Sequence, residues 1–297
     1  MLLDTFSDKV FKFFNYTFLT MALVVVLYPV IFIVSASISS PDLVNSGEMW
    51  LLPKGITFEG YKMVFDNPQI WNGYKNTLIY TFLGTSINLL VTIPASYALS
   101  RKDFVGRGLI TGLLLVTMFV SGGLIPSYLL IKSLGLIDTI WVMILPGAAS
   151  VYNIIVCRTF FQGSIPGELE ESAKIDGASN LTLFLKIILP LSAPIIAVMA
   201  LFYGVGHWNS YFNALIYIRN QDLYPLQLVL RQILVLQEMS AEMTMDAATA
   251  EAMQNKATIA DTVKYAVIIV ATLPLIVIYP FMQRFFVKGV MIGSVKG

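Results

Sequence analysis

The chain has 297 residues, of which 57% are hydrophobic and only 12% are charged, and its formal net charge at pH 7 is +1. Soluble domains are about 45–50% apolar, so this composition, with a mean hydropathy of +0.75, excludes an ordinary soluble protein and indicates a protein of the lipid bilayer. The small net charge gives no indication of a nucleic-acid or other polyanionic partner.

Six apolar stretches are long enough to cross about 30 Å of hydrocarbon as helices. The first stretch follows Lys9 and Lys12 like a signal peptide, but its apolar run is too long and lacks a small-residue cleavage site, so we expect it to remain as an anchor. The sequence therefore predicts an all-α membrane protein with six transmembrane helices. The predicted spans are residues 16–38, 77–98, 109–131, 140–158, 183–205 and 265–283.

The distribution of Lys and Arg between the connections predicts the orientation. The connections on one side, together with the two ends of the chain, hold 11 of the 19 basic residues, at about twice the density of the other side. Positive charge favours the cytoplasmic side, so we expect both termini in the cytoplasm. The predicted organisation is a cytoplasmic segment 1–15, a transmembrane domain 16–283 and a cytoplasmic tail 284–297.

The predicted spans are almost free of ionisable side chains, which bears on the energy source. Arg158 ends the fourth span and Lys186 lies near the start of the fifth. An ion-driven carrier needs groups that change charge inside the membrane. The sequence also lacks GxxxxGK[ST], HExxH and GxSxG, so it offers neither a phosphate-binding loop nor a catalytic motif. Energy for transport is expected from another subunit, and no catalytic activity is predicted.

Proline or glycine interrupts every predicted span, for example in "SGGLIP" at 121–126 and "PG" at 146–147. Proline removes a helical hydrogen bond, so such helices kink and the freed carbonyls need neighbours or water. Kinked helices around a cavity suit a pathway that opens and closes. Proline and glycine are also common in membrane helices in general, so the pattern supports transport without proving it.

A run of charge, "SIPGELEESAKIDG" at 164–177, lies in the predicted connection between the fourth and fifth spans. It predicts a short helix, because proline is tolerated in a first turn, three glutamates lie near the positive end of the dipole, and Gly177 suits a left-handed stop. Leu169 and Ala173 form a narrow face, and glutamates on such a helix can pair with arginines of a partner. The residues alone leave two interpretations, a docking helix and a solvated acidic loop.

The stretch "ELEESAKIDGASNLTLFLKIILPLSAP" resembles the EAA motif of permease subunits in bacterial binding-protein-dependent ABC importers. Ser172 departs from the alanine that is usual at its position, a small-for-small change. The stretches "ITFEGYKMVFDN", "NTLIYT", "GHWNSYFNALIYI" and "YPFMQRFFVKGVMIGSVKG" resemble the MalG-like carbohydrate branch, and in particular subunits that serve polysaccharides, oligosaccharides or alginate. The family positions are occupied by Glu171, Ala173, Asp176, Gly177, Ala178, Phe184, Leu189, Pro190 and Pro194.

The resemblance implies the type I ABC importer transmembrane fold in a bacterial plasma membrane, with transport by alternating access. It also implies the partners: a homologous second permease, two ATPase subunits that bind ATP and Mg²⁺, and an extracellular or periplasmic solute-binding protein. No cofactor is expected in this chain. A carrier or channel that works without an ATPase is the alternative, and a membrane enzyme or scaffold would need convergent catalytic residues that the sequence does not show.

The resemblance further implies that the segment 164–181 couples the permease to its ATPase. In the family the short helix seats in a groove of the ATPase, so closure of the ATPases moves the bundle. Glu171 is then the ion-pair partner of an ATPase arginine, Ala173 the close contact, and Gly177 the turn into the fifth span. The residues expected to take part in ATPase coupling are Glu170, Glu171, Ser172, Ala173, Asp176, Gly177 and Ala178.

Candidate substrate contacts lie at the outer end of the fifth span, because aromatic rings stack on sugars and amides bond their hydroxyls. The candidates are Trp208, Asn209, Tyr211, Asn213 and, from the second span, Asn88. A belt or packing role is the alternative for the aromatic residues, and helix–helix hydrogen bonding is the alternative for Asn88.

Two single residues and one long connection complete the predictions. His207, the only histidine, has no nearby Cys or acidic cluster, so no metal site is expected and a surface or packing role is predicted, as is packing for Cys157. The long external connection 206–264 includes "PLQLVLRQILVLQEM", whose helical apolar face could lie on the bilayer, pack on the bundle or meet the binding protein.

Overall fold

The structure is a computed structural model that describes residues 5–242, 263–280 and 283. Its regular elements are helical. The chain divides into two compact units, one formed by Met1–Pro68 with Leu230–Leu273 and the other by Gln69–Val229 with Pro274–Gly297. The helical class predicted from the apolar stretches is therefore confirmed for the described residues, whereas the predicted tail 284–297 lies outside them.

The first unit contains the long helix α1 (Phe6–Ser37) and the short helices α2 (Pro41–Asn45) and α3 (Glu59–Asp66). The helix α1 begins well before residue 16, because Thr5 and Asp8 form a capping box in which each side chain bonds the other's backbone N–H. The last predicted span appears as a helix over Val263–Pro280, and its Tyr265 ring meets Phe32 of α1 edge to face at 6.0 Å.

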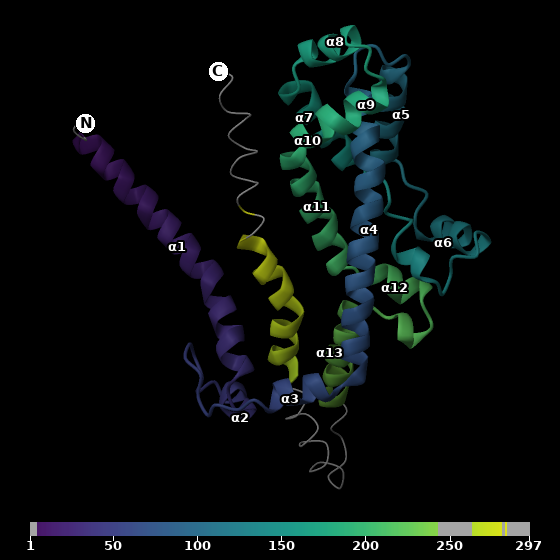
Figure 1. Cartoon of the computed structure of the whole chain (residues 1–297). Helices are drawn as coiled ribbons and strands as arrows, with labels where there is room; N and C mark the ends of the chain where they lie inside the picture. The colour runs from purple at the N-terminus through teal and green to yellow at the C-terminus, as the bar shows by residue number, and fades with distance from the viewer. Residues whose placement is uncertain (1–4, 243–262, 281–282, 284–297) are drawn as a thin grey trace. The chain divides into compact units, whose positions relative to one another are not determined.

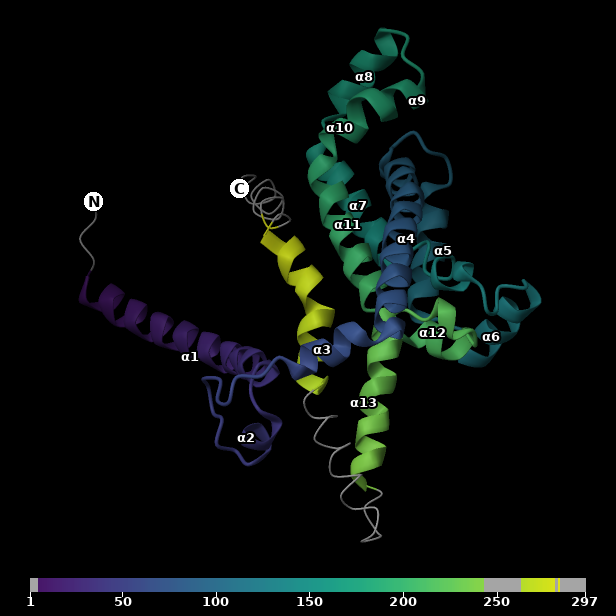
Figure 2. The ribbon, with the colours of Figure 1, turned by 60° about the horizontal axis from the view of Figure 1, so that its bottom comes forward.

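In the second unit the helix α4 (Pro68–Ser100) runs beside α11 (Ala193–Trp208). The short helices α8 (Gly167–Ile175) and α9 (Asn180–Leu183) lie toward one end of this pair (Figures 1 and 2). The face of α4 that is buried carries small and polar residues four apart, which allow close approach and interhelical hydrogen bonds. Thr92 bonds the hydroxyl of Tyr203 at 2.7 Å. This stripe consists of Tyr80, Gly84, Asn88, Thr92 and Ser96.

Three predicted spans are not continuous helices, so their prediction as single helices was wrong. The third is broken into α5 (Arg107–Phe119) and α6 (Leu124–Ser133), which meet at 114°. The break falls at the run of glycines before Pro126. Gly123 has a φ of +83° there, a backbone conformation that residues other than glycine disfavour.

The fourth predicted span, 140–158, contains a 3₁₀ turn at Ile140–Met143, an irregular stretch through the Pro-Gly pair, and only then α7 (Val151–Ser164). A helix of this length rises about 21 Å, less than the hydrocarbon core. The backbone carbonyls freed before α7 need other donors, and the side-chain amide of Asn88 is one of them.

The fifth predicted span is bent by 77° between Asn180–Leu191 and Ala193–Trp208. Its first part comprises α9 (Asn180–Leu183), a π-helical turn at Phe184–Ile188 and α10 (Leu189–Leu191). Pro190 and Pro194 have no N–H for the helix ladder, and the buried Ser192 hydroxyl donates to the carbonyl of Ile188 at 2.6 Å.

By length and composition, three helices of the described residues are able to cross a membrane, or up to five when each bent pair counts as one span. The long connection after α11 forms α12 (Phe212–Tyr217), a 3₁₀ turn at Gln221–Leu223 and α13 (Leu226–Glu242). Leu226 and Val229 of α13 are buried, which favours packing among the roles considered for this face. Most of the stretch after α13 lies outside the described residues.

Candidate coupling site

The acidic run forms α8 (Gly167–Ile175), as the sequence predicts, and it ends in a Schellman motif. Ala178 N–H donates to the Ala173 carbonyl at 2.9 Å and Gly177 N–H donates to the Lys174 carbonyl at 3.1 Å. Gly177 has a φ of +73°, which confirms its predicted left-handed conformation. One detail differs: Pro166 lies at the N-cap rather than inside the first turn, because α7 continues to Ser164.

The two faces of α8 have different environments. Ala173 is only 5% exposed and lies in a core cluster with residues of this chain's own helices, including Tyr97 and Phe161. The expectation that Ala173 offers a small contact surface to a partner does not match this burial. Its small size instead allows α8 to approach the bundle closely.

The outward face of α8 carries most of the other predicted coupling residues. Ile175 is 86% exposed, although it is a large apolar residue, and the sequence reasoning missed it. A signal was present, because Ile175 follows Glu171 by four residues on the side opposite Leu169 and Ala173. The exposed predicted residues are Glu171, Ser172, Asp176 and Gly177, whereas Glu170 and Ala178 are half-buried.

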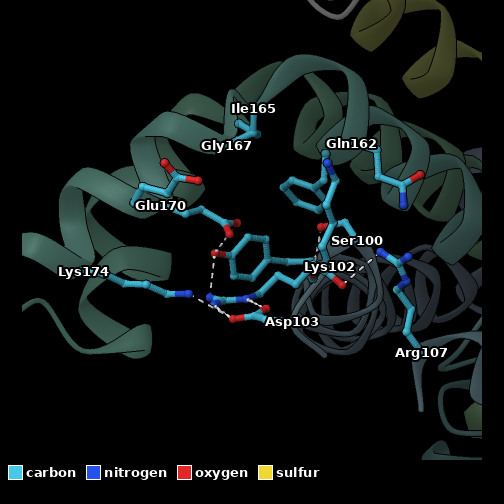
Figure 3. Close-up of a pocket in the computed structure, with 13 residues that line it drawn as sticks. Ser100, Lys102, Asp103, Arg107, Gln162, Ile165, Gly167, Glu170 and Lys174 are labelled. Carbon is cyan, nitrogen blue, oxygen red and sulfur yellow. Dashed lines mark hydrogen bonds and ion pairs between the residues drawn. The ribbon is translucent and has the colours of Figure 1, made fainter. Parts of the chain in front are cut away.

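The inward face of α8 is bonded to the end of α4 (Figure 3). The hydroxyl of Tyr97, in the last turn of α4, donates to Glu170 at 3.1 Å. Lys174 donates to the carboxylate of Asp103, in the turn after α4, at 3.1 Å. Glu170 and Lys174 are four residues apart, so both bonds come from one face of α8.

Arg101 joins these two contacts. Its guanidinium binds Asp103 through two parallel hydrogen bonds of 2.8 and 2.6 Å. A further nitrogen donates to the Tyr97 hydroxyl at 3.3 Å and to Asn180 of α9 at 3.1 Å. The Arg101 side chain is 9% exposed, so its charge is largely removed from water and depends on these partners.

The charges around Asp103 stabilise its ionised form. Hydrogen bonds from Arg101 and Lys174 hold the pKa of the Asp103 carboxyl well below its usual range. The same hydrogen bond to Asp103 raises the pKa of the Arg101 guanidinium. Both groups therefore remain charged throughout the physiological range of pH.

Tyr97 also packs against the helices on either side of α8. Its ring stacks on Phe184 of the π-helical turn at 5.3 Å and meets Phe161 of α7 edge to face at 5.7 Å. Arg158 of α7 donates to the carbonyl of Leu99 at 3.0 Å. A cavity of about 470 Å³ lies between these elements, lined by residues of α7, α8 and the α4–α5 turn (Figure 3). The end of α4 is thus the point where α7, α8 and α9 are joined.

A second polar cluster surrounds Asn88 near the middle of α4. Its amide donates to the carbonyls of Gly147 and Ala148 at 2.6 and 3.0 Å, and its oxygen lies 2.7 Å from His207 Nε2. Asn88 is fully buried and so supplies donors to the irregular stretch before α7. The hydrogen-bonding alternative for Asn88 matches these contacts. His207 lies against Gly84, as a packing role predicts.

A cavity of about 220 Å³ adjoins this cluster, and only two predicted path residues, Asn88 and Asn213, line it. Trp208 is 3% exposed and its ring meets Tyr74 at 6.1 Å, which matches the packing alternative. Asn209 is exposed and donates to its own helix, and Tyr211 is also exposed. His207 and Ser210 line the cavity but were not among the predicted contacts.

Two further residue predictions concern metals and thiols. Within residues 5–242, 263–280 and 283, no group of three His, Cys, Asp or Glu side chains is placed to hold a metal ion. Cys157 is completely buried in the core cluster with Tyr97 and Phe161, in agreement with its predicted packing role.

Membrane-length helices, broken spans and an anchored acidic helix between two of them define the chain as a membrane transport subunit. The chain belongs to the family of binding-protein-dependent transport system inner membrane components, which it matches over residues 1–292. It is accordingly a permease subunit of an ABC importer in the inner membrane, and not an enzyme.

Individual relatives match nearly the whole chain. Protein LplC of Bacillus subtilis (strain 168) is 41% identical over 99% of this chain and 97% of its own length. The polygalacturonan/rhamnogalacturonan transport system permease protein YtcP of the same organism is 38% identical over 98% of this chain and 100% of its own. A chain from the crystal structure of a bacterial ABC transporter involved in the import of the acidic polysaccharide alginate is 32% identical, with a TM-score of 0.85, over 96% of this chain and 100% of that chain.

Proposed function

We propose that this permease takes up a carbohydrate, an oligosaccharide or a fragment of a polysaccharide, by alternating access. The names of the relatives support this substrate class, since they refer to polygalacturonan, rhamnogalacturonan and alginate. The transporter comprises this chain, a homologous second permease, two ATPase subunits that bind ATP and Mg²⁺, and an extracellular or periplasmic solute-binding protein. This chain crosses the membrane six times, with both termini in the cytoplasm, and holds no cofactor.

The observation that carries the proposal is the double-faced helix α8. A helix with an exposed acidic residue, Glu171, and an exposed apolar residue, Ile175, needs a partner surface with both an apolar contact and a basic group. An ATPase groove with an arginine at its edge has this chemistry. Glu171 is its ion-pair partner, and Ser172, Asp176 and Gly177 border the contact.

A matched pair of variants tests the docking of α8 in proteoliposomes that contain the complete transporter. Glu171→Gln is expected to lower uptake per ATP hydrolysed, because a desolvated ion pair at an interface is lost. Glu168→Gln, also exposed on α8 but outside the family positions, is the control and leaves this ratio unchanged. Equal ratios for Glu171→Gln and the unmodified transporter would count against docking through this face.

The orientation has a separate test. Cys157 is buried, so a cysteine introduced by Glu168→Cys, an exposed position of α8 outside the proposed contact, is the accessible thiol among the described residues. A membrane-impermeant maleimide is expected to label it in inverted vesicles and not in intact cells. Labelling in intact cells would place α8 outside the cytoplasm and contradict the proposed coupling.

The cavity beside Asn88 is the proposed place of sugar contact in this chain. Its described lining offers the amide of Asn213 together with Ser210, His207 and Phe202 and includes no charged side chain, whereas the amide of Asn88 is already bonded to neighbouring groups. Such groups bond hydroxyls and pack against a ring face. Trp208, Asn209 and Tyr211 do not line this cavity, so the contact proposed here does not include them.

Uptake of radiolabelled oligogalacturonides and of neutral oligosaccharides tests the substrate class. Thermal shifts of the partner solute-binding protein with the same panel identify which of them is delivered. With a delivered sugar, Asn213→Ala is expected to raise the KM of uptake more than Asn209→Ala, whose side chain bonds its own helix. Uptake that continues without any ATPase would instead support a carrier or channel.

A further inference from the structure

We propose that Tyr97, Arg101 and Asp103 clamp α8 to the end of α4, so that α8 and α4 move as one body and the movement of the ATPases enters the bundle through α4. This inference rests on the proposed docking of α8. The three residues are positioning residues, since they act through α8 rather than touching the motor or the transported molecule.

Two bonds, spaced along one face, hold α8 to the end of α4. The helix α8 is held at Glu170 by Tyr97 and at Lys174 by Asp103, one helical turn apart. A helix that is held at a single point can roll about its axis, whereas two points along one face prevent this. The buried Ala173, which lies between the two bonds, packs in the core cluster with Tyr97 and Phe161.

The guanidinium of Arg101 links both bonds. Arg101 binds Asp103 with two hydrogen bonds and also donates to the Tyr97 hydroxyl, so the two anchors of α8 share a single partner (Figure 3). Planar bidentate geometry fixes the angle as well as the distance between charged groups. A lysine at this position would keep the charge but lose that geometry.

Different residues of α8 make the bonds to α4 and form the proposed docking face. The bonds to α4 come from Glu170 and Lys174, whereas Glu171 and Ile175 are exposed. The clamp therefore leaves the proposed docking face free. Without the clamp, the ATPase should still dock on α8, but its movement should no longer be passed on to α4.

The helix α4 is continuous from the clamp to the polar cluster around Asn88. Its 33 residues from Pro68 to Ser100 form one helix, whereas the spans that contain α5 and α11 are bent by 114° and 77°. Asn88 of the same helix bonds the irregular stretch at Gly147 and Ala148 and meets His207 of α11. A displacement at the α8 end of α4 consequently reaches the polar cavity without passing through a break in a helix.

The test uses the complete transporter in proteoliposomes and measures uptake per ATP hydrolysed, with oligogalacturonides, or the panel sugar that the binding protein delivers, as the probe. Asp103→Asn and Arg101→Lys are each expected to lower this ratio by about 2- to 30-fold, the range for residues that transmit coupling. Lys102→Gln is the matched control: it changes a neighbouring exposed charge that makes none of these bonds, and it leaves the ratio unchanged. A ratio for Asp103→Asn equal to that of Lys102→Gln overturns the proposal.

Two further readouts separate a clamp from a merely structural role. Copurification of the ATPase with Asp103→Asn is expected to be complete, because the docking face is intact. Asp103→Asn and Lys174→Gln together are expected to lower the ratio no further than Asp103→Asn alone, since the bond that Lys174→Gln removes is already weakened when Asp103 loses its charge. Effects that multiply in the double variant, or loss of the ATPase on purification, overturn the clamp.

The outcome also distinguishes this inference from the proposed function. If docking through α8 is wrong, Glu171→Gln leaves the uptake ratio unchanged. If docking is right and the clamp is wrong, Glu171→Gln lowers the ratio while Asp103→Asn does not. Asp103→Glu, which keeps the carboxylate, is expected to recover part of the ratio when the clamp is right.

Discussion

The middle and the end of α4 hold their neighbours by different chemistry. Around Asn88 the contacts are neutral, since a fully buried amide donates to two backbone carbonyls and meets a histidine. At the α8 end the contacts are ionic, and Asp103 remains half exposed. Charge is costly inside hydrocarbon but is tolerated where water reaches, so a single helix uses amides at depth and ion pairs at its end.

The difference predicts which region contributes stability and which contributes coupling. Where contacts are buried and neutral, losing a hydrogen-bond partner or adding an atom lowers the free energy of unfolding. The ion pair between Lys174 and Asp103 is about half exposed on both sides and contributes about 0.2–1 kcal/mol, so its loss is not expected to unfold the bundle. Changes in the middle of α4 should therefore reduce stability, and changes at its end should reduce coupling with little effect on stability.

The largest expected effect comes from Gly84→Ala. A Cβ at Gly84 would overlap the ring of His207, so the two helices must separate or the ring must move. We expect a loss of about 2–3 kcal/mol, measured by thermal unfolding in detergent. Gly112→Ala in α5 is the control, because nothing lies within 4 Å of its added Cβ, and it should be neutral or stabilising.

Should Gly84→Ala prove as stable as Gly112→Ala, the close approach of α4 and α11 at this point would be wrong. His207→Ala combined with Gly84→Ala is expected to recover part of the loss, since it removes the atoms that clash. No such recovery would indicate that the clash is not the cause.

Asn88→Ala should have the next largest effect. It leaves the carbonyls of Gly147 and Ala148 without their amide donor, and a buried unpaired group costs about 1–3 kcal/mol. We expect a loss of about 2 kcal/mol in the same unfolding assay. Asn209→Ala is the control, because its exposed amide donates to the last turn of its own helix, α11. Equal losses of stability for the two variants would refute the comparison.

Gly177→Ala tests the end of α8 at a smaller scale. Nothing lies within 4 Å of an added Cβ, so the effect comes from the φ of +73° alone and is expected to be about 1 kcal/mol. Gly167→Ala has equal space and no positive φ, so it should cost less. Equal stabilities would mean that the backbone at Gly177 can relax without cost.

The smallest expected effect concerns pH. Asp103 has a lowered pKa in the folded protein, so its contribution to stability is present above the pKa of a free aspartate and is lost only as pH falls through the lower, folded value. Uptake per ATP should therefore not change between about pH 7.5 and pH 5.5 on account of this group, because both values lie above its ordinary pKa. A fall in the ratio over this range that Asp103→Asn abolishes would contradict the network.

The local features of α8 could be predicted from the sequence, because they depend on neighbouring residues. The glutamates of the first turn, the stop at Gly177 and the family motif all lie within one short stretch. The breaks in the third, fourth and fifth spans were signalled by Pro and Gly, but the size of each bend depends on which neighbours satisfy the freed backbone groups.

The inward face of α8 could not be predicted in the same way. Asp103 and Lys174 are 71 residues apart in the chain, and periodicity carries no information about such a pair. The family resemblance implied that Ala173 contacts a partner, and only the fold shows that it packs in this chain's own core. The adjacent charges of Arg101 and Asp103, at the end of a long apolar helix, were the available signal.

The distance between α8 and the end of α4 during the ATP cycle tests the central claim most directly. Spin labels at Glu168→Cys and Lys102→Cys, both exposed positions outside the clamp, report this distance in the complete transporter. The clamp predicts the same distance in the nucleotide-free and ATP-trapped states, and a change between the states once Asp103→Asn is added. A distance that already changes in the transporter with an intact clamp would show that α8 moves without α4.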